Sequence, residues 1–221
     1  MSFKFDYKCP NCNQTYVGIR DDFGNFVGCE EDGVIIKKCS YCREPLLMTG
    51  LLEAKRATKN NPAKIQIAIA NTTKNMASGG QNDSASILSL GMLYLLKGAY
   101  ENAITRFKQV IDLDPACADA YYYLSIALLG GQKPFVKQIA VIKQIEENLL
   151  SAEAFAEGDD EKLAQINYLL AYVKYDFYSR KFLKTLPSYN EVLVKSVAYG
   201  LTMEDRMDLF EILKQPRPTG F

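Results

Sequence analysis

Two kinds of hydrophobic pattern follow one another along the chain. Within residues 5–48, the runs 15–19 and 34–38 are rich in β-branched and aromatic residues, which is typical of strands. Asp32-Gly33 stands between them and is a strong hairpin signal. We therefore predict a small antiparallel sheet in this part of the chain.

After the first third of the chain, hydrophobic residues recur every three or four positions, which is the spacing of an amphipathic helix. Residues 65–69 alternate in a strand-like way, but Asn61-Pro62 before them is a helix start signal. Two prolines in the segment 215–221 predict an extended, flexible tail. The predicted helices are 62–76, a pair between Ser84 and Pro115 that is divided at Gly98, 119–129, 134–150, 161–177, 188–198 and 203–213.

Four of the six cysteines form two Cys-x-x-Cys pairs, Cys9 with Cys12 and Cys39 with Cys42. A gap of two residues lets both sulfurs of a tight turn face one ion. Two such turns complete a tetrahedral site of four thiolates, which Zn²⁺ favours. We therefore predict that these four cysteines hold one structural Zn²⁺ ion per chain.

Two cysteine turns on a small antiparallel sheet resemble a zinc ribbon. A closed site of four thiolates implies a structural ion, because no coordination position remains for a substrate. An iron–sulfur cluster can use the same four ligands, disulfides would require an oxidising compartment, and a redox pair would need a βαβ context. Cys29 lies outside both turns and is either a small buried hydrophobic residue or a spare thiolate.

Residues 84–117 carry small, aromatic and helix-breaking residues at fixed spacing. This pattern resembles the tetratricopeptide repeat (TPR), a 34-residue helix–turn–helix unit. Gly91 and Ala103 are small where two helices approach each other, while Tyr94 and Phe107 fill the space around them. The matching residues are Leu90, Gly91, Tyr94, Gly98, Tyr100, Ala103, Ile104, Phe107 and Pro115.

A second repeat begins at Ala118 and keeps the family pattern in its first helix. Its second half departs from the pattern, because Lys137 stands where the repeat has a small residue. A degenerate third unit follows, and residues 203–213 resemble a terminal capping helix that opens at Thr202.

The expected fold class is a small β zinc ribbon followed by an all-α helical-repeat, TPR-like domain. The expected domains are the ribbon at 1–48, a connector with a helix at 49–82, helical repeats with a capping helix at 83–214, and a flexible tail at 215–221.

The TPR resemblance implies a groove lined by the first helix of each repeat. Its residues in this sequence are apolar: Leu88, Met92, Leu95, Tyr122, Ile126 and Leu129. Such a groove accepts either an amphipathic helix of a partner protein or a segment of the same chain, such as 62–76 or the C-terminal helix. The Lys and Asn residues with which the family clamps a peptide carboxylate are absent from these positions.

Composition excludes several kinds of chemistry. The 221 residues contain no histidine, which excludes a Ser-His-Asp triad, a His general base and a His metal ligand. Basic and acidic residues number 26 each, so the chain lacks the excess of positive charge typical of proteins that coat nucleic acid. No run approaches the roughly 18 apolar residues of a membrane span. The N-terminus lacks the apolar core of a signal peptide, so we expect a cytoplasmic protein.

These observations favour a non-enzymatic adaptor that holds proteins together through the TPR-like groove. The alternative is a nucleic-acid-associated regulator that uses the ribbon and the basic segment 55–74. The ribbon argues against this alternative, because residues 1–50 contain six basic and seven acidic side chains. A thiol enzyme that uses the Cys-x-x-Cys pairs is the third and least favoured class.

Overall fold

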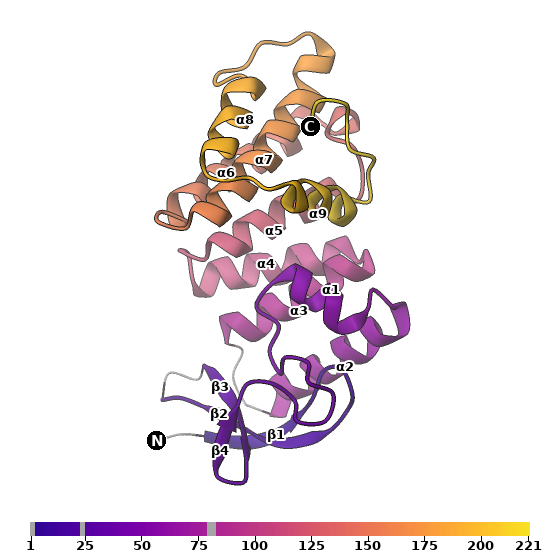
Figure 1. Cartoon of the computed structure of the whole chain (residues 1–221), viewed down its shortest axis with the longest axis vertical. Helices are drawn as coiled ribbons and strands as arrows, with labels where there is room; N and C mark the ends of the chain where they lie inside the picture. Colours follow the sequence, from indigo (N-terminus) through magenta and orange to yellow (C-terminus); the bar gives the residue numbers. More distant parts are fainter. Residues whose placement is uncertain (1–2, 23–24, 79–82) are drawn as a thin grey trace. The chain divides into compact units, whose positions relative to one another are not determined.

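The computed structural model describes residues 3–22, 25–78 and 83–221. The chain divides into two compact units, Met1–Asp114 and Pro115–Phe221. The strands and helices α1 to α4 belong to the first unit, and helices α5 to α9 belong to the second (Figure 1). Among the described helices, none is both long and apolar enough to cross a membrane.

The sheet of the first unit is antiparallel, and its strands follow one another in sequence order. Tyr7 is paired with Tyr16, and Cys29 with Ile36. The side chains of Tyr7, Tyr16, Cys29 and Leu46 pack together in a small core that also contains two of the paired cysteines. The strands are β1 (Phe3–Lys8), β2 (Thr15–Arg20), β3 (Phe26–Glu31) and β4 (Val34–Ile36).

The helices of the first unit contain the predicted TPR pair. Gly98 adopts a left-handed conformation with φ of 81° and ends the first helix of the pair. Gly91 faces Phe107 so closely that an added Cβ would lie 2.6 Å from its ring, which explains the small residue at this position. The helices are α1 (Leu51–Thr58), α2 (Pro62–Ser78), α3 (Ser84–Lys97) and α4 (Tyr100–Leu113).

Helix α2 fulfils the prediction of a helix at 62–76 and is fixed to the ribbon by two asparagines. The side chain of Asn75 accepts a hydrogen bond from the backbone N–H of Lys8 and donates one to its carbonyl, both at 2.8 Å. Asn71 donates to the backbone carbonyl of Cys9 at 3.0 Å. The part of the expected connector that the structure describes therefore belongs to the same compact unit as the ribbon, while residues 79–82 lie outside the described range.

A buried ion pair joins the ribbon to α3. The guanidinium group of Arg20, at the end of β2, contacts the carboxylate of Asp83, and both side chains are almost fully buried. Asp83 also caps α3 by accepting a hydrogen bond from the backbone N–H of Ser86 at 2.7 Å. One carboxylate thus anchors the strand and starts the helix.

The second unit consists of two helix pairs and a final helix. Ser188 and Thr202 begin α8 and α9 with capping boxes, as predicted for Thr202. The predicted helix at 134–150 is instead a short 3₁₀ turn at Pro134–Val136 followed by a separate helix that begins at Ile139. The helices are α5 (Ala118–Leu129), α6 (Ile139–Phe155), α7 (Asp160–Phe177), α8 (Tyr189–Ala198) and α9 (Met203–Leu213).

The segment after α9 differs from the flexible tail that its composition predicts. Its residues 216, 217, 219 and 220 are exposed, but Phe221 is buried with an exposed fraction of 5%. The ring of Phe221 packs against tyrosines of α7 and α8. An aromatic side chain that removes this much surface from water holds the end of an otherwise exposed segment.

Candidate metal centre

The four paired cysteines converge on one point of the ribbon. Their sulfur atoms all lie within 4.8 Å of one another, with 3.7 Å between those of Cys9 and Cys42 and 3.6 Å between those of Cys12 and Cys39. A tetrahedral ion with metal–sulfur bonds of about 2.3 Å places its sulfurs about 3.8 Å apart. All four are free thiols. The distances and the donor atoms therefore fit a tetrahedral metal ion bound by four thiolates.

Both cysteine turns have the same backbone geometry. The N–H of Asn13 donates to the carbonyl of Cys9 at 3.2 Å, and the N–H of Arg43 donates to the carbonyl of Cys39 at 2.9 Å. Asn13 and Arg43 both adopt left-handed conformations, with φ of 67° and 64°. Asparagine tolerates this conformation well, whereas for arginine it is uncommon, so the fold imposes it at the second turn.

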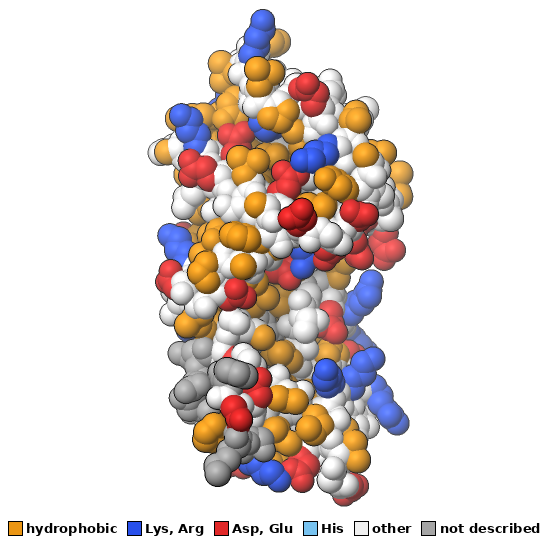
Figure 2. Space-filling model, turned by 90° about the vertical axis from the view of Figure 1, so that its left-hand side faces the viewer, with side chains coloured by type: hydrophobic (Ala, Val, Ile, Leu, Met, Phe, Trp, Pro, Cys, Tyr) orange, Lys and Arg blue, Asp and Glu red, His pale blue; other side chains and the backbone are white. Residues whose placement is uncertain are grey.

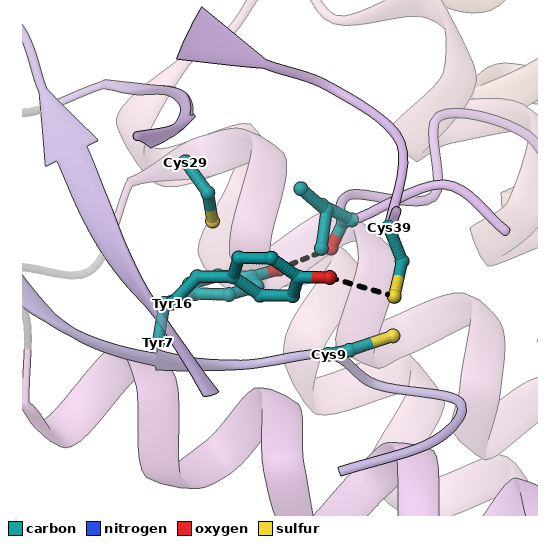
Figure 3. Packing of buried hydrophobic residues seen from close by; sticks show 6 residues of the cluster. Tyr7, Cys9, Tyr16, Cys29 and Cys39 are labelled. Carbon is teal, nitrogen blue, oxygen red and sulfur yellow. Dashed lines mark hydrogen bonds between the residues drawn. The ribbon is translucent and has the colours of Figure 1, made fainter. Parts of the chain in front are cut away.

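The hydroxyl of Tyr16 orients Cys39 from outside the site (Figure 3). It lies 3.0 Å from the sulfur of Cys39 and accepts a hydrogen bond from the backbone N–H of Ser40 at 3.1 Å. The hydroxyl of Ser40 in turn donates to Glu31 at 2.7 Å. A metal-bound thiolate carries no proton, so in the loaded site Tyr16 is the donor to Cys39.

The sulfurs differ in how readily they ionise. Burial opposes ionisation of Cys39, but the backbone N–H groups of Cys42 and Tyr41 and the hydroxyl of Tyr16 outweigh it and lower the pKa of this thiol to about 7. Burial raises the pKa of Cys9 and, to a smaller extent, that of Cys12. Several thiolates in one small volume repel one another, so a cation is what allows all four to be ionised together.

Cys29 lies outside this group of sulfurs. It is completely buried in β3, and burial raises the pKa of its thiol to about 12. Its sulfur is not among the four that lie close enough together to share one ion. Of the two interpretations of Cys29, the structure therefore favours the small buried hydrophobic residue.

Replacing Tyr16 by phenylalanine is expected to weaken metal binding by about 10- to 100-fold, which is the usual effect of removing a group that orients a ligand. The variant loses the hydrogen bonds of the hydroxyl to Cys39 and to the backbone N–H of Ser40 but keeps the ring. Competition with a zinc chelator measures the change. Tyr41→Phe is the matched control, because Tyr41 lies in the turn between Cys39 and Cys42 but its side chain is exposed. Equal affinities of the two variants would contradict the role of Tyr16.

The residues predicted to line a groove lie on α3 and α5, the helices that the pattern assigned to them. Five of the six are buried in the chain itself, and Leu88 of α3 is half-buried. Within the first unit, α3 packs against α1 and α2 as well as α4. The segment 62–76, which lies in α2, thus packs against α3, one of the two helices predicted to line the groove. The six residues are Leu88, Met92 and Leu95 on α3, and Tyr122, Ile126 and Leu129 on α5.

The basic residues of the segment 55–74 lie on α1, α2 and the turn between them. The side chains of Arg56, Lys59 and Lys74 are exposed. Figure 2 shows basic side chains gathered on one flank of the N-terminal unit. The alternative function, a nucleic-acid-associated regulator, stays a prediction. The basic side chains of the segment 55–74 supply the positive charge that it requires.

Comparison with known proteins supports the helical part of this description. A family model of the TPR repeat matches residues 91–130, from the middle of α3 to the end of α5. No curated protein and no solved structure matches the chain. The fold and the site define a class of protein in which a β ribbon with a four-cysteine cluster precedes a series of helices. Within those helices the chain contains a TPR repeat, which confirms the predicted fold class.

Proposed function

We propose that this protein is a non-enzymatic adaptor, which brings other proteins together through its TPR-like helices while a structural Zn²⁺ ion stabilises its ribbon. The observation that carries the proposal is the TPR repeat at 91–130, because stacked helix pairs of this kind form extended binding surfaces. We place its activity in the cytoplasm, where thiols stay reduced and available to a metal.

The four-cysteine site supports a structural role for the metal. Four protein thiolates fill a tetrahedral coordination sphere and leave no position for a substrate. Cys9 and Cys39 are themselves members of the small ribbon core. A core in which metal ligands replace hydrophobic side chains depends on the ion for its stability. Zinc is the ion that this ligand set favours.

The accessible part of α3 is the surface that we assign to a partner. Ala85 is exposed and Leu88 is half-buried, and their spacing of three residues places them on one face of the helix. Met92 and Leu95 lie deeper, where the protein's own helices cover them. An amphipathic helix is the kind of partner that fits an apolar helix face, with its anchors one turn apart.

Changing Leu88 to glutamate tests this assignment. The variant is expected to stay folded and to reduce the recovery of bound proteins about fivefold or more, since truncation of an anchor residue costs more than about 1 kcal/mol of binding free energy. Affinity capture from the source cells with quantitative mass spectrometry measures recovery, and thermal melting checks the fold. Val34→Glu is the matched control, because Val34 is an exposed apolar residue of the ribbon.

Three outcomes would contradict the proposal. Recovery that is unchanged in Leu88→Glu would show that α3 is not the binding surface. An equal loss in Leu88→Glu and Val34→Glu would show that any added charge has this effect. A strong loss of thermal stability in Leu88→Glu would mean instead that the protein's own chain needs this face.

A further inference from the structure

A cage of four tyrosines in the second unit encloses a single phenylalanine. The ring centroid of Phe221 lies 5.0 Å from that of Tyr175 and 5.9 Å from that of Tyr168. Two further tyrosine rings lie 6.1 and 6.2 Å from it. We call this group the tyrosine cage: Tyr168, Tyr172 and Tyr175 of α7, and Tyr189 at the start of α8.

Phe221 reaches the cage at the end of a strap, residues 214–220, that has no regular secondary structure. The side-chain amide of Gln215 donates to the carbonyl of Gly131, and the N–H of Phe221 donates to the carbonyl of Pro218 at 3.2 Å. The other side chains of the strap are exposed or half-buried. A single buried aromatic side chain on an otherwise exposed, irregular segment is how a short peptide anchors itself in a pocket.

The walls of the cage are set by helices that have other contacts. α7 packs against α6, α8 and α9, and Phe210 of α9 lies 4.9 Å from the ring of Tyr172. Tyrosine is a residue that binding sites use often, because it offers a large rigid surface with a polar tip. The walls of the cage therefore belong to α7 and α8, and Phe221 at the end of the strap fills the space between them.

With Phe221 in place, one polar group of the tyrosine cage has no hydrogen-bond partner in the described part of the chain. The hydroxyl of Tyr168 is buried and has no hydrogen-bond partner among the described residues. The ring of Phe221 cannot supply one. A buried hydroxyl without a partner destabilises the state that contains it. An occupant with an acceptor near this hydroxyl would thus bind better than the protein's own strap.

We propose that the tyrosine cage is a binding site for a short peptide segment of a partner protein, anchored by an aromatic residue, and that Phe221 occupies this site in the free protein. A second copy of the chain is a poor competitor, because its identical strap gains no contact over the one already tethered beside the cage. A partner segment that satisfies Tyr168 gains such a contact. The cage lies on α7 and α8, not on α3, so this proposal and the proposed function can fail separately.

A synthetic peptide with the sequence of residues 215–221 tests the proposal against the full-length chain. Phe221→Ala empties the cage, and we expect this variant to bind the labelled peptide at least about tenfold more tightly than the wild type does, because the tethered strap competes at an effective concentration in the millimolar range. Fluorescence anisotropy measures binding. A peptide with alanine in place of phenylalanine is the control and is expected not to bind.

A second variant keeps the test valid if the first is poorly folded. Phe221→Leu retains most of the apolar volume, and its affinity for the peptide is expected to fall between those of the wild type and Phe221→Ala. If neither variant binds the peptide more tightly than the wild type, Phe221 is an ordinary core residue and the proposal is wrong. Sedimentation gives a further check, since a wild-type dimer that Phe221→Ala abolishes would assign the cage to a second copy and overturn the partner assignment.

Discussion

Replacing Cys39 by serine is expected to abolish stoichiometric metal binding and to unfold most of the N-terminal unit. Structural zinc sites contribute about 10–16 kcal/mol to the folding of small domains, which is comparable to the total stability of about 5–15 kcal/mol that most proteins possess. Loss of the ion should spread beyond the ribbon, because Asn71 and Asn75 of α2 bind the backbone of Cys9 and Lys8. The separately compact unit 115–221 is expected to keep its helices.

Metal analysis and circular dichroism check this expectation on the same samples. The helical signal should fall by the share that α1 to α4 contribute, and a chelator should produce the same change in the wild type. Cys29→Ser is the matched control, because Cys29 is a buried cysteine of the same ribbon that lies outside the group of four sulfurs. It should keep one equivalent of metal. A Cys39→Ser protein with a full equivalent of metal would contradict the assignment of the site.

Local patterns predicted the four-cysteine site and the first repeat. The Cys-x-x-Cys spacing fixes which sulfurs share a turn, and the ligand requirements of one ion bring the two turns together. Gly91 and Phe107 are predictable for a similar reason, since a close approach of two helices needs a small residue opposite a large one. Each of these features depends on a steric or chemical rule that acts within a short piece of chain.

The contacts that fix the ribbon to the helices could not be predicted in this way. Asn71 and Asn75 bind residues that are more than sixty positions away, and nothing in their own neighbourhood specifies those partners. Their spacing of four residues on the same helix face as Ile65, Ala68 and Met76 was the available signal. Asparagines on a face that is otherwise buried and apolar indicate that polar backbone lies against that face.

The buried end of the strap was missed for a related reason. Two prolines predict an extended segment; residues 214–220 form no helix or strand, but the segment ends in a turn that the N–H of Phe221 closes on the carbonyl of Pro218. Composition does not reveal that one aromatic residue of this segment packs against tyrosine side chains of α7 and α8. The tyrosines of α7 lie within the helix predicted at 161–177, and a cluster of this residue type is the signal for binding that the helical pattern alone does not use.

Replacing Asp83 by alanine is expected to lower the free energy of unfolding by about 3–5 kcal/mol, which is the usual cost of leaving one partner of a buried ion pair without the other. Asp83 pairs with Arg20 and also caps α3 through the N–H of Ser86. Asp83→Asn keeps an oxygen for the cap, so its cost should be smaller than that of Asp83→Ala by about 1 kcal/mol, the typical contribution of such a cap.

Urea unfolding of the two variants measures both effects. The double variant Arg20→Met/Asp83→Asn should recover part of the stability lost in Asp83→Asn, because it contains no buried charge, and replacing a buried ion pair by an apolar side chain is often close to neutral. Recovery in the double variant separates the electrostatic contribution from that of the helix cap. If the free energy of unfolding of Asp83→Ala is within about 0.5 kcal/mol of the wild-type value, as for a surface substitution, the ion pair does not hold β2 to α3. The asparagines of α2 would then be the main connection between the ribbon and the helices.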